Sequence, residues 1–292
     1  MFQALRKYWI FSFIFTLLAA DIFIFYFLWQ DSRHAFTFAM LDVGQGDALF
    51  IESPTGVQVL VDGGPPKKIL SELSRVMSPF DRSIDAIIIT NPDADHIAGF
   101  LDILRLYNIG EVFEPGTLTD SKTYQNLKDE IKKKNIPDVL ARKGMRIDLG
   151  GGAIIEILFP DRDVRAWATN DGSVVGRLSY GNSSIMLAGD ASTKTEKLIL
   201  TENKKENLKS EILKVGHHGS RTSSSREFIG AVSPEYAFIS SGKNNKYGHP
   251  HKEVLDILAS AGADVLRTDL SGAIILKCAR MGSCEINKLK NL

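Results

Sequence analysis

Three side chains that can bind a metal ion occupy one short segment of this sequence: Asp93, Asp95 and His96. The segment follows the apolar run 86–89 and precedes a helix-like stretch over residues 97–107. A buried strand that ends where a helix begins would present these side chains at the edge of a sheet. Carboxylates this close repel one another unless a cation offsets them, although a helix dipole also favours acidic residues at a helix start. The spacing therefore predicts a divalent metal site.

Two other predicted strands also end in possible metal ligands. The apolar run 184–188 leads into Asp190, and the run 212–215 leads into His217 and His218. A Gly-Asp pair is a common turn, and a histidine pair can be structural, but two of the six histidines of the chain stand side by side here. Because successive side chains of an extended segment point to opposite faces, we expect one imidazole to bind metal and the other to face substrate or a supporting residue.

A polar loop near the carboxyl end carries candidates for substrate contact. His249, in a Gly-His-Pro-His sequence, is a candidate to position substrate, to transfer a proton or to bind metal. Lys243 in the same loop could balance the charge of a phosphate. Ser220 follows the histidine pair directly. These three residues form the expected substrate-binding set.

Taken in order, these motifs resemble the hydrolase domain of ComEC-type competence proteins, a variant of the metallo-β-lactamase fold. The matching segments are 41–47 (Leu-Asp-Val-Gly-Gln-Gly-Asp), 91–96 (Asn-Pro-Asp-Ala-Asp-His), 189–190 (Gly-Asp), 217–220 (His-His-Gly-Ser) and 248–251 (Gly-His-Pro-His). The resemblance covers about residues 36–276. It implies an α/β fold, a four-layer αββα sandwich with the site at one edge of two packed sheets, in which segment 41–47 is a scaffold rather than a source of ligands.

The resemblance implies one or two divalent ions, Zn²⁺ or Mn²⁺, that activate water and polarise the scissile group. When the family's ligand pattern is carried over residue by residue, it implies that one ion is held by Asp95, His96, Asp190 and one of His217 and His218. Asp190 then bridges to a second ion. Catalytic roles fall to Asp95, His218 and His249.

The second ion position departs from the family pattern. Asn91 and Asp93 stand where two imidazoles are usual, and the sequence has no histidine between His96 and His217 to supply the third. Asn91 is a weak neutral ligand, and the surviving oxygen donors favour Mn²⁺ or Mg²⁺ over Zn²⁺. We therefore expect one tight ion, alone or with a labile hard ion; the alternative is a site that has lost its activity.

The amino terminus departs from a soluble composition. Residues 8–30 are almost wholly apolar, with Asp21 as their one charge, and Arg6 and Lys7 precede them. This length and the positive-inside rule predict a single-pass anchor over residues 1–31, with a hydrolase domain over 32–292 outside the cytoplasmic membrane. A signal peptide cleaved near Ala19-Ala20 and a buried soluble helix are the alternatives.

Composition adds few constraints. The 292 residues contain 35 basic and 35 acidic side chains, so no global basic field indicates a nucleic-acid binder. The basic run 132–134 is interpreted as a solvated helix face. Cys278 and Cys284 lie between two strand-like runs. A hairpin disulfide and two free thiols are equally open, because spacing does not define geometry.

The predicted function is metal-assisted hydrolysis of a phosphodiester, with DNA as the substrate that the resemblance implies. A single predicted span cannot form a DNA channel. The alternatives are another hydrolase of the same fold (a lactonase, β-lactamase or phosphorylcholine esterase) and a non-catalytic relative with a degenerate metal site.

Overall fold

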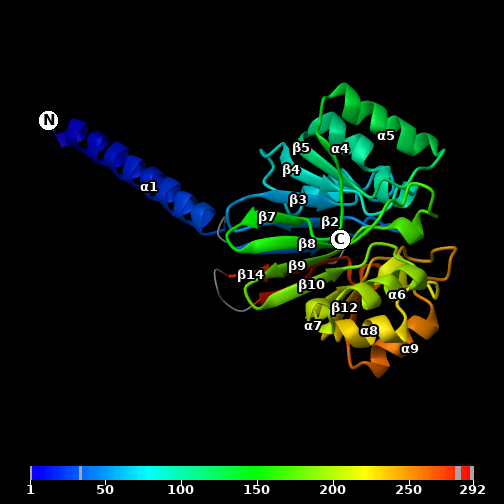
Figure 1. The fold of residues 1–292 in the computed structure, drawn as a ribbon. Helices are drawn as coiled ribbons and strands as arrows, with labels where there is room; N and C mark the ends of the chain where they lie inside the picture. Colours follow the sequence, from blue (N-terminus) through cyan, green and yellow to red (C-terminus); the bar gives the residue numbers. More distant parts are fainter. Residues whose placement is uncertain (1, 33–34, 280–283, 290–292) are drawn as a thin grey trace.

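Two β-sheets face each other and helices cover their outer faces in the computed structural model, which describes residues 2–32, 35–279 and 284–289 (Figure 1). The first sheet has the order β15-β14-β1-β2-β3-β4-β5-β6. Its strands are β1 (Phe36–Met40), β2 (Leu49–Glu52), β3 (Gln58–Val61), β4 (Ser83–Ile88), β5 (Asn108–Glu114), β6 (Asp138–Leu140), β14 (Ala273–Cys278) and β15 (Cys284–Leu289). Strands β3 to β6 run parallel, while the strands from β15 to β3 pair antiparallel.

The second sheet has the order β13-β12-β11-β10-β9-β8-β7. Its strands are β7 (Arg146–Gly150), β8 (Ala153–Phe159), β9 (Val175–Tyr180), β10 (Ser183–Leu187), β11 (Ile212–Lys214), β12 (Tyr236–Ile239) and β13 (Asp264–Arg267). Strands β10 to β13 are parallel and β7 to β10 antiparallel. Each sheet therefore has a parallel half, and the loops at the carboxyl ends of parallel strands are where this kind of fold places its ligands.

The helices lie in two outer layers. Helices α2 (Ile69–Leu73), α3 (Ala94–Ile97), α4 (Phe100–Leu106) and α5 (Lys122–Lys133) connect strands of the first sheet, and α6 (Thr193–Glu202), α7 (Lys205–Leu208), α8 (Arg226–Val232) and α9 (Lys252–Ser260) connect strands of the second. The short α10 (Thr268–Ser271) links β13 to β14. Figure 1 shows α4 and α5 on one side of the sandwich and α6, α8 and α9 on the other.

Three apolar layers hold this sandwich together. Along β1, Phe38 and Met40 point into the core between the sheets, while Ala39 points to the core beneath the first helical layer. This alternation is the two-residue period of a strand buried on both faces. A third core, with Phe228 and Leu258, lies under the helices of the second sheet. The four-layer αββα expectation is confirmed.

The disulfide that the sequence left open is formed between Cys278 and Cys284. The two cysteines face each other in the register of β14 and β15, with Cα atoms 4.0 Å apart. The hairpin thus brings together two thiols that the spacing alone did not pair.

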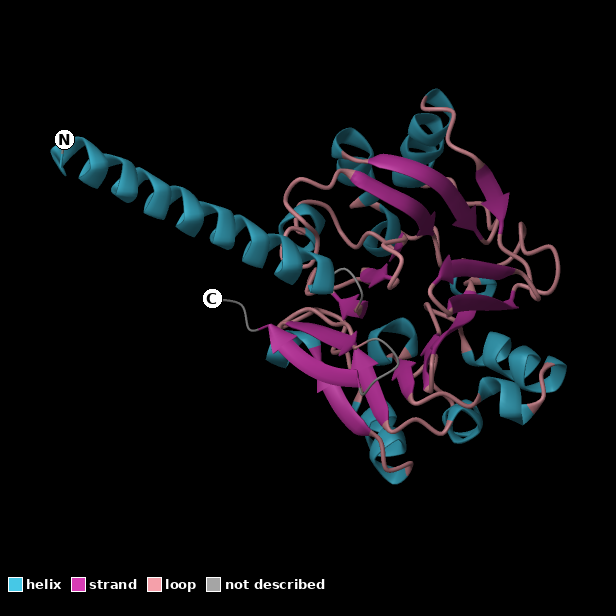
Figure 2. Cartoon of the chain, turned by 90° about the vertical axis from the view of Figure 1, so that its left-hand side faces the viewer, coloured by secondary structure: helices cyan, strands magenta, loops and turns pink. Residues whose placement is uncertain are grey.

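Helix α1 (Phe2–Ser32) stands apart from both sheets in the two views (Figure 1, Figure 2). Within the described residues, none of the helices has the length and apolar character needed to cross a bilayer. The expectation of a single-pass anchor over residues 1–31 is therefore not supported, and the placement outside the cytoplasmic membrane stays a prediction.

Candidate metal centre

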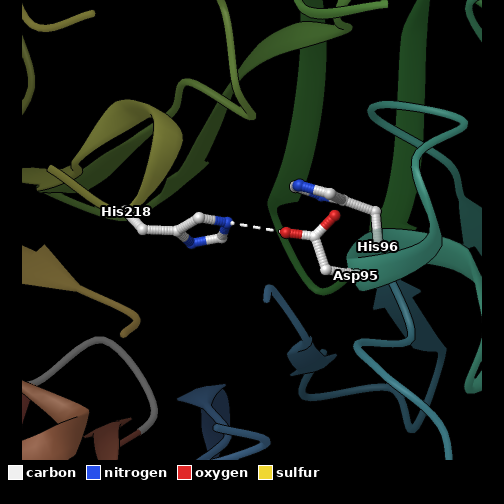
Figure 3. Close-up of side chains that lie close together, drawn as sticks. All are labelled: Asp95, His96 and His218. Carbon is white, nitrogen blue, oxygen red and sulfur yellow. Dashed lines mark hydrogen bonds and ion pairs between the residues drawn. The ribbon is translucent and has the colours of Figure 1, made fainter. Parts of the chain in front are cut away.

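Loops from both sheets bring the predicted ligands to one place. Asp95 and His96 lie in α3, directly after β4; Asp190 follows β10; and His218 follows β11. Figure 3 shows Asp95 and His96 approaching from one side and His218 from the other. The parallel strands of both sheets end at the same edge of the sandwich. Residues more than a hundred positions apart in the sequence, such as Asp95 and His218, therefore meet there.

The side-chain atoms of this group lie close together: donors of Asp95, His96 and His218 lie within 4.8 Å of one another, and so do donors of Asp47, Asp190 and His218. Asp95 Oδ2 is 3.3 Å from His218 Nε2, and His96 Nε2 is 3.1 Å from Asp190 Oδ2. The remaining distance, from His218 Nε2 to Asp190 Oδ2, is 3.8 Å. Two imidazole nitrogens and two carboxylate oxygens in this arrangement match the donors that Zn²⁺ or Mn²⁺ takes in proteins.

Each imidazole is held from its other nitrogen. His96 Nδ1 lies 2.8 Å from Asp62 Oδ2, and Asp62 accepts hydrogen bonds from the Thr90 amide at 2.8 Å and from the Thr90 hydroxyl at 2.5 Å. His218 Nδ1 lies 3.1 Å from the carbonyl oxygen of Ser240. Partners of this kind direct both Nε2 atoms toward the carboxylates of Asp95 and Asp190, as in the carboxylate–histidine–metal arrangement.

The His-His pair differs from the expected extended segment. It lies in a tight turn, with φ of 48° at His217 and 54° at His218, so both rings face the same region, contrary to the prediction of opposite faces. His218 is 1% exposed, whereas His217 is 24% exposed. His217 Nε2 is 3.8 Å from Asp190 Oδ2, and its Nδ1 is 3.0 Å from the Thr222 hydroxyl. The geometry favours His218 as the buried ligand and places His217 on the open side.

The electrostatics of the group suit a cation. Burial alone would lower the pKa of His218, but the charges of Asp190 and Asp47 outweigh it and raise that pKa to about 10. The pKa of His96 also rises well above its usual range, because Asp190 and Asp62 outweigh its burial. In turn, burial would raise the pKa of Asp190, but His96 and His218 hold it well below its ordinary value. In the metal-free protein, protons on both rings supply the positive charge that a divalent ion would supply.

The residues fit a bound ion on a second ground. His96 Nε2 and Asp190 Oδ1 are buried atoms without a well-formed hydrogen bond; the charged groups nearest to them are Asp190 Oδ2, 3.1 Å from His96 Nε2, and the Lys214 ammonium, 3.8 Å from Asp190 Oδ1. Unsatisfied buried polar atoms are rare in proteins, and two in one cluster indicate an interaction with a further group. We therefore assign Asp95, His96, Asp190 and His218 as the candidate ligands of one divalent ion.

Three buried residues of this region were not among the predicted ligands. Asp62 supports His96, as described above, and Asp47 Oδ1 is 3.4 Å from His218 Nδ1. Lys214 is 1% exposed; its ammonium contacts Asp47 and donates to the Gly189 carbonyl at 2.9 Å. Asp47 and Asp62 lie next to strand ends in the sequence, where such folds place their sites. The signal for Lys214 was a lone charge inside an apolar strand.

The second candidate position contains oxygen and amide groups. Asn91 Nδ2 donates to Asn170 Oδ1 at 2.5 Å, and Asp93 Oδ2 accepts a hydrogen bond from Thr169 at 2.9 Å. Among the described residues, the groups of three or more His, Cys, Asp or Glu donors within 4.8 Å of one another do not include Asp93. Asn170 was missed by the sequence interpretation, in which its segment was only a loop. Asn170 lies beside Asn91, at the second ion position, where the family pattern has a further histidine.

Of the expected substrate residues, the structure brings His249 beside the histidine pair. The His249 ring lies 5.5 Å from the His217 ring, and Gln45 Nε2 is 3.5 Å from His249 Nδ1. Burial and the neighbouring imidazoles lower the pKa of His249 to about 4, so this ring is neutral at pH 7 and can accept a proton. Ser220 is buried and pairs with the Thr222 hydroxyl at 3.0 Å. Lys243 is exposed and lines a neighbouring cavity of about 360 Å³.

Known proteins are similar to this chain over most of its length. Residues 41–243 match the metallo-β-lactamase superfamily. ComE operon protein 3 of Bacillus subtilis is 34% identical over 262 residues, which are 80% of this chain and 32% of that protein. Competence protein ComA of Neisseria gonorrhoeae is 33% identical over 69% of this chain and 26% of its own length. Recombination protein 2 of Haemophilus influenzae is 29% identical over 84% of this chain and 29% of its own length. The chain thus spans about a third of the length of these relatives.

Solved structures show the same fold. Igni18, a metallo hydrolase from Ignicoccus hospitalis, superposes with a TM-score of 0.52 at 15% identity and covers 87% of this chain and all of its own. The metallo-β-lactamase fold protein YhfI from Bacillus subtilis has a TM-score of 0.50 at 12% identity and covers 79% of this chain and 95% of its own. At these identities the likeness concerns the fold alone. The chain belongs to the metallo-β-lactamase superfamily, and its curated relatives are proteins of the ComEC type.

Proposed function

We propose that this protein is a metal-dependent phosphodiesterase that cleaves DNA. The observation that carries the proposal is the convergence of Asp95, His96, Asp190 and His218, from both sheets, on one point that opens toward His217 and His249. The substrate class is supported by the curated relatives, whose names refer to competence and recombination, processes that act on DNA.

The residues of the chain have distinct parts in this reaction. A divalent ion at the four ligands would lower the pKa of a bound water to about 7 and polarise the ester. Asp62 and the Ser240 carbonyl keep the two imidazoles in the tautomer that leaves Nε2 unprotonated. His249, neutral at pH 7, is positioned to accept a proton.

The ion content is the second part of the proposal. The position with two imidazoles binds one ion tightly, as Zn²⁺ or Mn²⁺. The position formed by Asn91, Asp93 and Asn170 offers only amide and carboxylate groups, which favour a hard ion bound more weakly, Mn²⁺ or Mg²⁺. Two zinc ions per chain that both exchange slowly would contradict this assignment.

Metal analysis and cleavage assays test the proposal on the full chain, purified without chelator. Single-stranded DNA and bis(p-nitrophenyl) phosphate are incubated with added Mn²⁺ or Zn²⁺, alongside the Asp95→Ala/His96→Ala variant. We expect cleavage that depends on metal and disappears in the variant. Bound metal with hydrolysis of a lactone or β-lactam, and of neither phosphodiester, would move the protein to another hydrolase class. A folded protein without metal and without cleavage would identify a non-catalytic relative.

A further inference from the structure

A groove separate from the ligand cluster begins at the amino end of α6. It has a volume of about 510 Å³. The lining residues are Arg162, Trp167, Thr193, Lys194, Lys197 and Leu198. Three cations and an indole line it; two of the cations have a carboxylate partner beside the lining, since Arg162 pairs with Asp161 at 2.6 Å and Lys194 with Asp171 at 2.9 Å. This composition is unexpected in a chain whose acidic and basic residues balance at 35 each, and it indicates an anionic ligand with an apolar part.

The indole at the centre of the groove is held in place. Trp167 packs against Phe159, with ring centroids 6.0 Å apart, and Lys194 Nζ lies 4.4 Å from the Trp167 ring centroid. Lys194 in turn contacts Asp171 Oδ2 at 2.9 Å. The ring is therefore positioned before any ligand arrives, which reduces the entropy lost on binding.

Both walls of the groove lead to the candidate metal centre. One wall is α6, whose first residue, Thr193, stands three positions after Asp190. The other wall is the loop that begins at Trp167, and this loop continues to Thr169, which donates to Asp93, and to Asn170. Asp171 joins the two walls, because it accepts hydrogen bonds from Ser192 at 2.5 Å and from Lys194. A chain lying in the groove would therefore extend into the centre.

We propose that this groove binds a segment of single-stranded nucleic acid next to the bond that is cleaved. Arg162 and Lys197 contact its phosphates, and a base takes the place of the Lys194 ammonium over the indole of Trp167, the combination that single-strand binding sites use. The position beside a scissile bond rests on the proposed function, whereas binding in the groove does not. Duplex DNA fits less well, because its bases are stacked and cannot reach a half-buried ring.

Binding is tested on the full chain with chelator present, so that no cleavage intervenes. The chain has three tryptophans, and a Trp9→Phe/Trp29→Phe background leaves Trp167 as the single indole reporter. The probe is a 20-nucleotide deoxythymidylate strand, titrated at several salt concentrations. We expect quenching of Trp167 fluorescence. Arg162→Ala/Lys197→Ala raises Kd roughly tenfold and reduces the steepness of log K against log salt by about 1.4, since each lost phosphate contact removes about 0.7.

A matched charge control lies on α5 and just beyond it. Lys132→Ala/Lys134→Ala also removes two exposed charges, at a helix that contributes nothing to the groove lining, and it leaves binding unchanged. Equal weakening by the two double variants would overturn the proposal, because the effect would then be general attraction. Equal quenching of Trp167 by heparin or by a blunt duplex would also overturn it, since neither offers an unstacked base.

Cleavage separates this inference from the proposed function. If the protein is a nuclease, Arg162→Ala/Lys197→Ala lowers the ratio of kcat/KM for the oligonucleotide to kcat/KM for bis(p-nitrophenyl) phosphate roughly tenfold. Binding that depends on the groove without any cleavage would refute the nuclease and leave the groove assignment standing. Cleavage with an unchanged ratio and unchanged binding would refute the groove assignment alone.

Discussion

Replacing Asp62 with asparagine tests whether the support of His96 controls metal binding. Asp62 Oδ2 lies 2.8 Å from His96 Nδ1, and its Oδ1 accepts the Thr90 amide at 2.8 Å. In Asp62→Asn the amide oxygen would stay on the Thr90 amide and the NH₂ group would face His96 Nδ1. An imidazole that accepts at Nδ1 carries its proton on Nε2, toward the candidate metal position. The variant therefore favours the tautomer that cannot bind the ion.

The expected loss follows from this change. Removal of a supporting partner of a metal-bound histidine lowers metal affinity roughly 10- to 100-fold, which corresponds to about 1.4–2.7 kcal/mol. Competition with a chromophoric chelator, at fixed pH and with Zn²⁺ and Mn²⁺ in turn, measures this affinity. Because asparagine has the shape of aspartate and keeps the Thr90 contact, we expect the folded structure to persist, which circular dichroism checks.

Glu114→Gln is the matched control. Glu114 is also a buried carboxylate, which accepts from the Tyr124 hydroxyl at 3.1 Å and from Lys128 at 2.8 Å, and none of these groups belongs to the candidate centre. Its substitution should change the stability of the protein and leave its metal affinity unaltered. If Asp62→Asn binds both ions as tightly as the unmodified protein, the argument that Asp62 orients His96 for metal is wrong.

Three further results are expected. Lys214→Met leaves the carboxylate of Asp47 buried without its ammonium partner, so urea denaturation should show a loss of about 3–5 kcal/mol; recovery is expected on adding Asp47→Asn, and a loss below about 1 kcal/mol would refute the buried pair. Because His96 and His218 have raised pKa values, about 10 for His218, they hold protons that an ion must displace, so metal affinity should rise with pH toward that value. When a chelator keeps the protein metal-free, the same protons stabilise the fold. Their contribution is complete below the histidine pKa of the unfolded chain, about 6.5, and is lost as pH rises through the raised pKa values of the folded protein. A free energy of unfolding that increases from pH 7 to pH 10 would contradict the assignment. Finally, His249, whose pKa is lowered to about 4 in the free protein, should supply an acidic limb near that pH in the kcat/KM profile, absent in His249→Gln.

The architecture was predictable because its signals are local. Apolar runs such as those of β4 and β11 reveal buried strands, and polar residues that follow directly after them reveal the edge where a site can form. The motifs at these strand ends carried the resemblance to a known family, and that resemblance implied the sandwich. The membrane span was the exception. The apolar composition of the amino terminus predicted a single-pass anchor, but none of the helices in the described residues has the length and apolar character to cross a bilayer.

The ligand types were also readable from the sequence, but their assignments were not. Motif spacing predicted the ligands Asp95, His96 and Asp190 and a histidine pair. It could not decide whether His217 or His218 of that pair is the buried ligand. That choice depends on two left-handed backbone conformations and on a carbonyl from β12's carboxyl end, at Ser240.

Tertiary structure alone decided the supporting residues. Asp47 precedes β2, Asp62 follows β3 and Lys214 ends β11. No local pattern distinguishes a carboxylate that orients an imidazole from one that faces solvent. Sequence by itself determined which chemical groups are available and which strand ends deliver them. Only the packing of two sheets decided which groups meet, because distances between loops far apart in the chain are set by the whole fold.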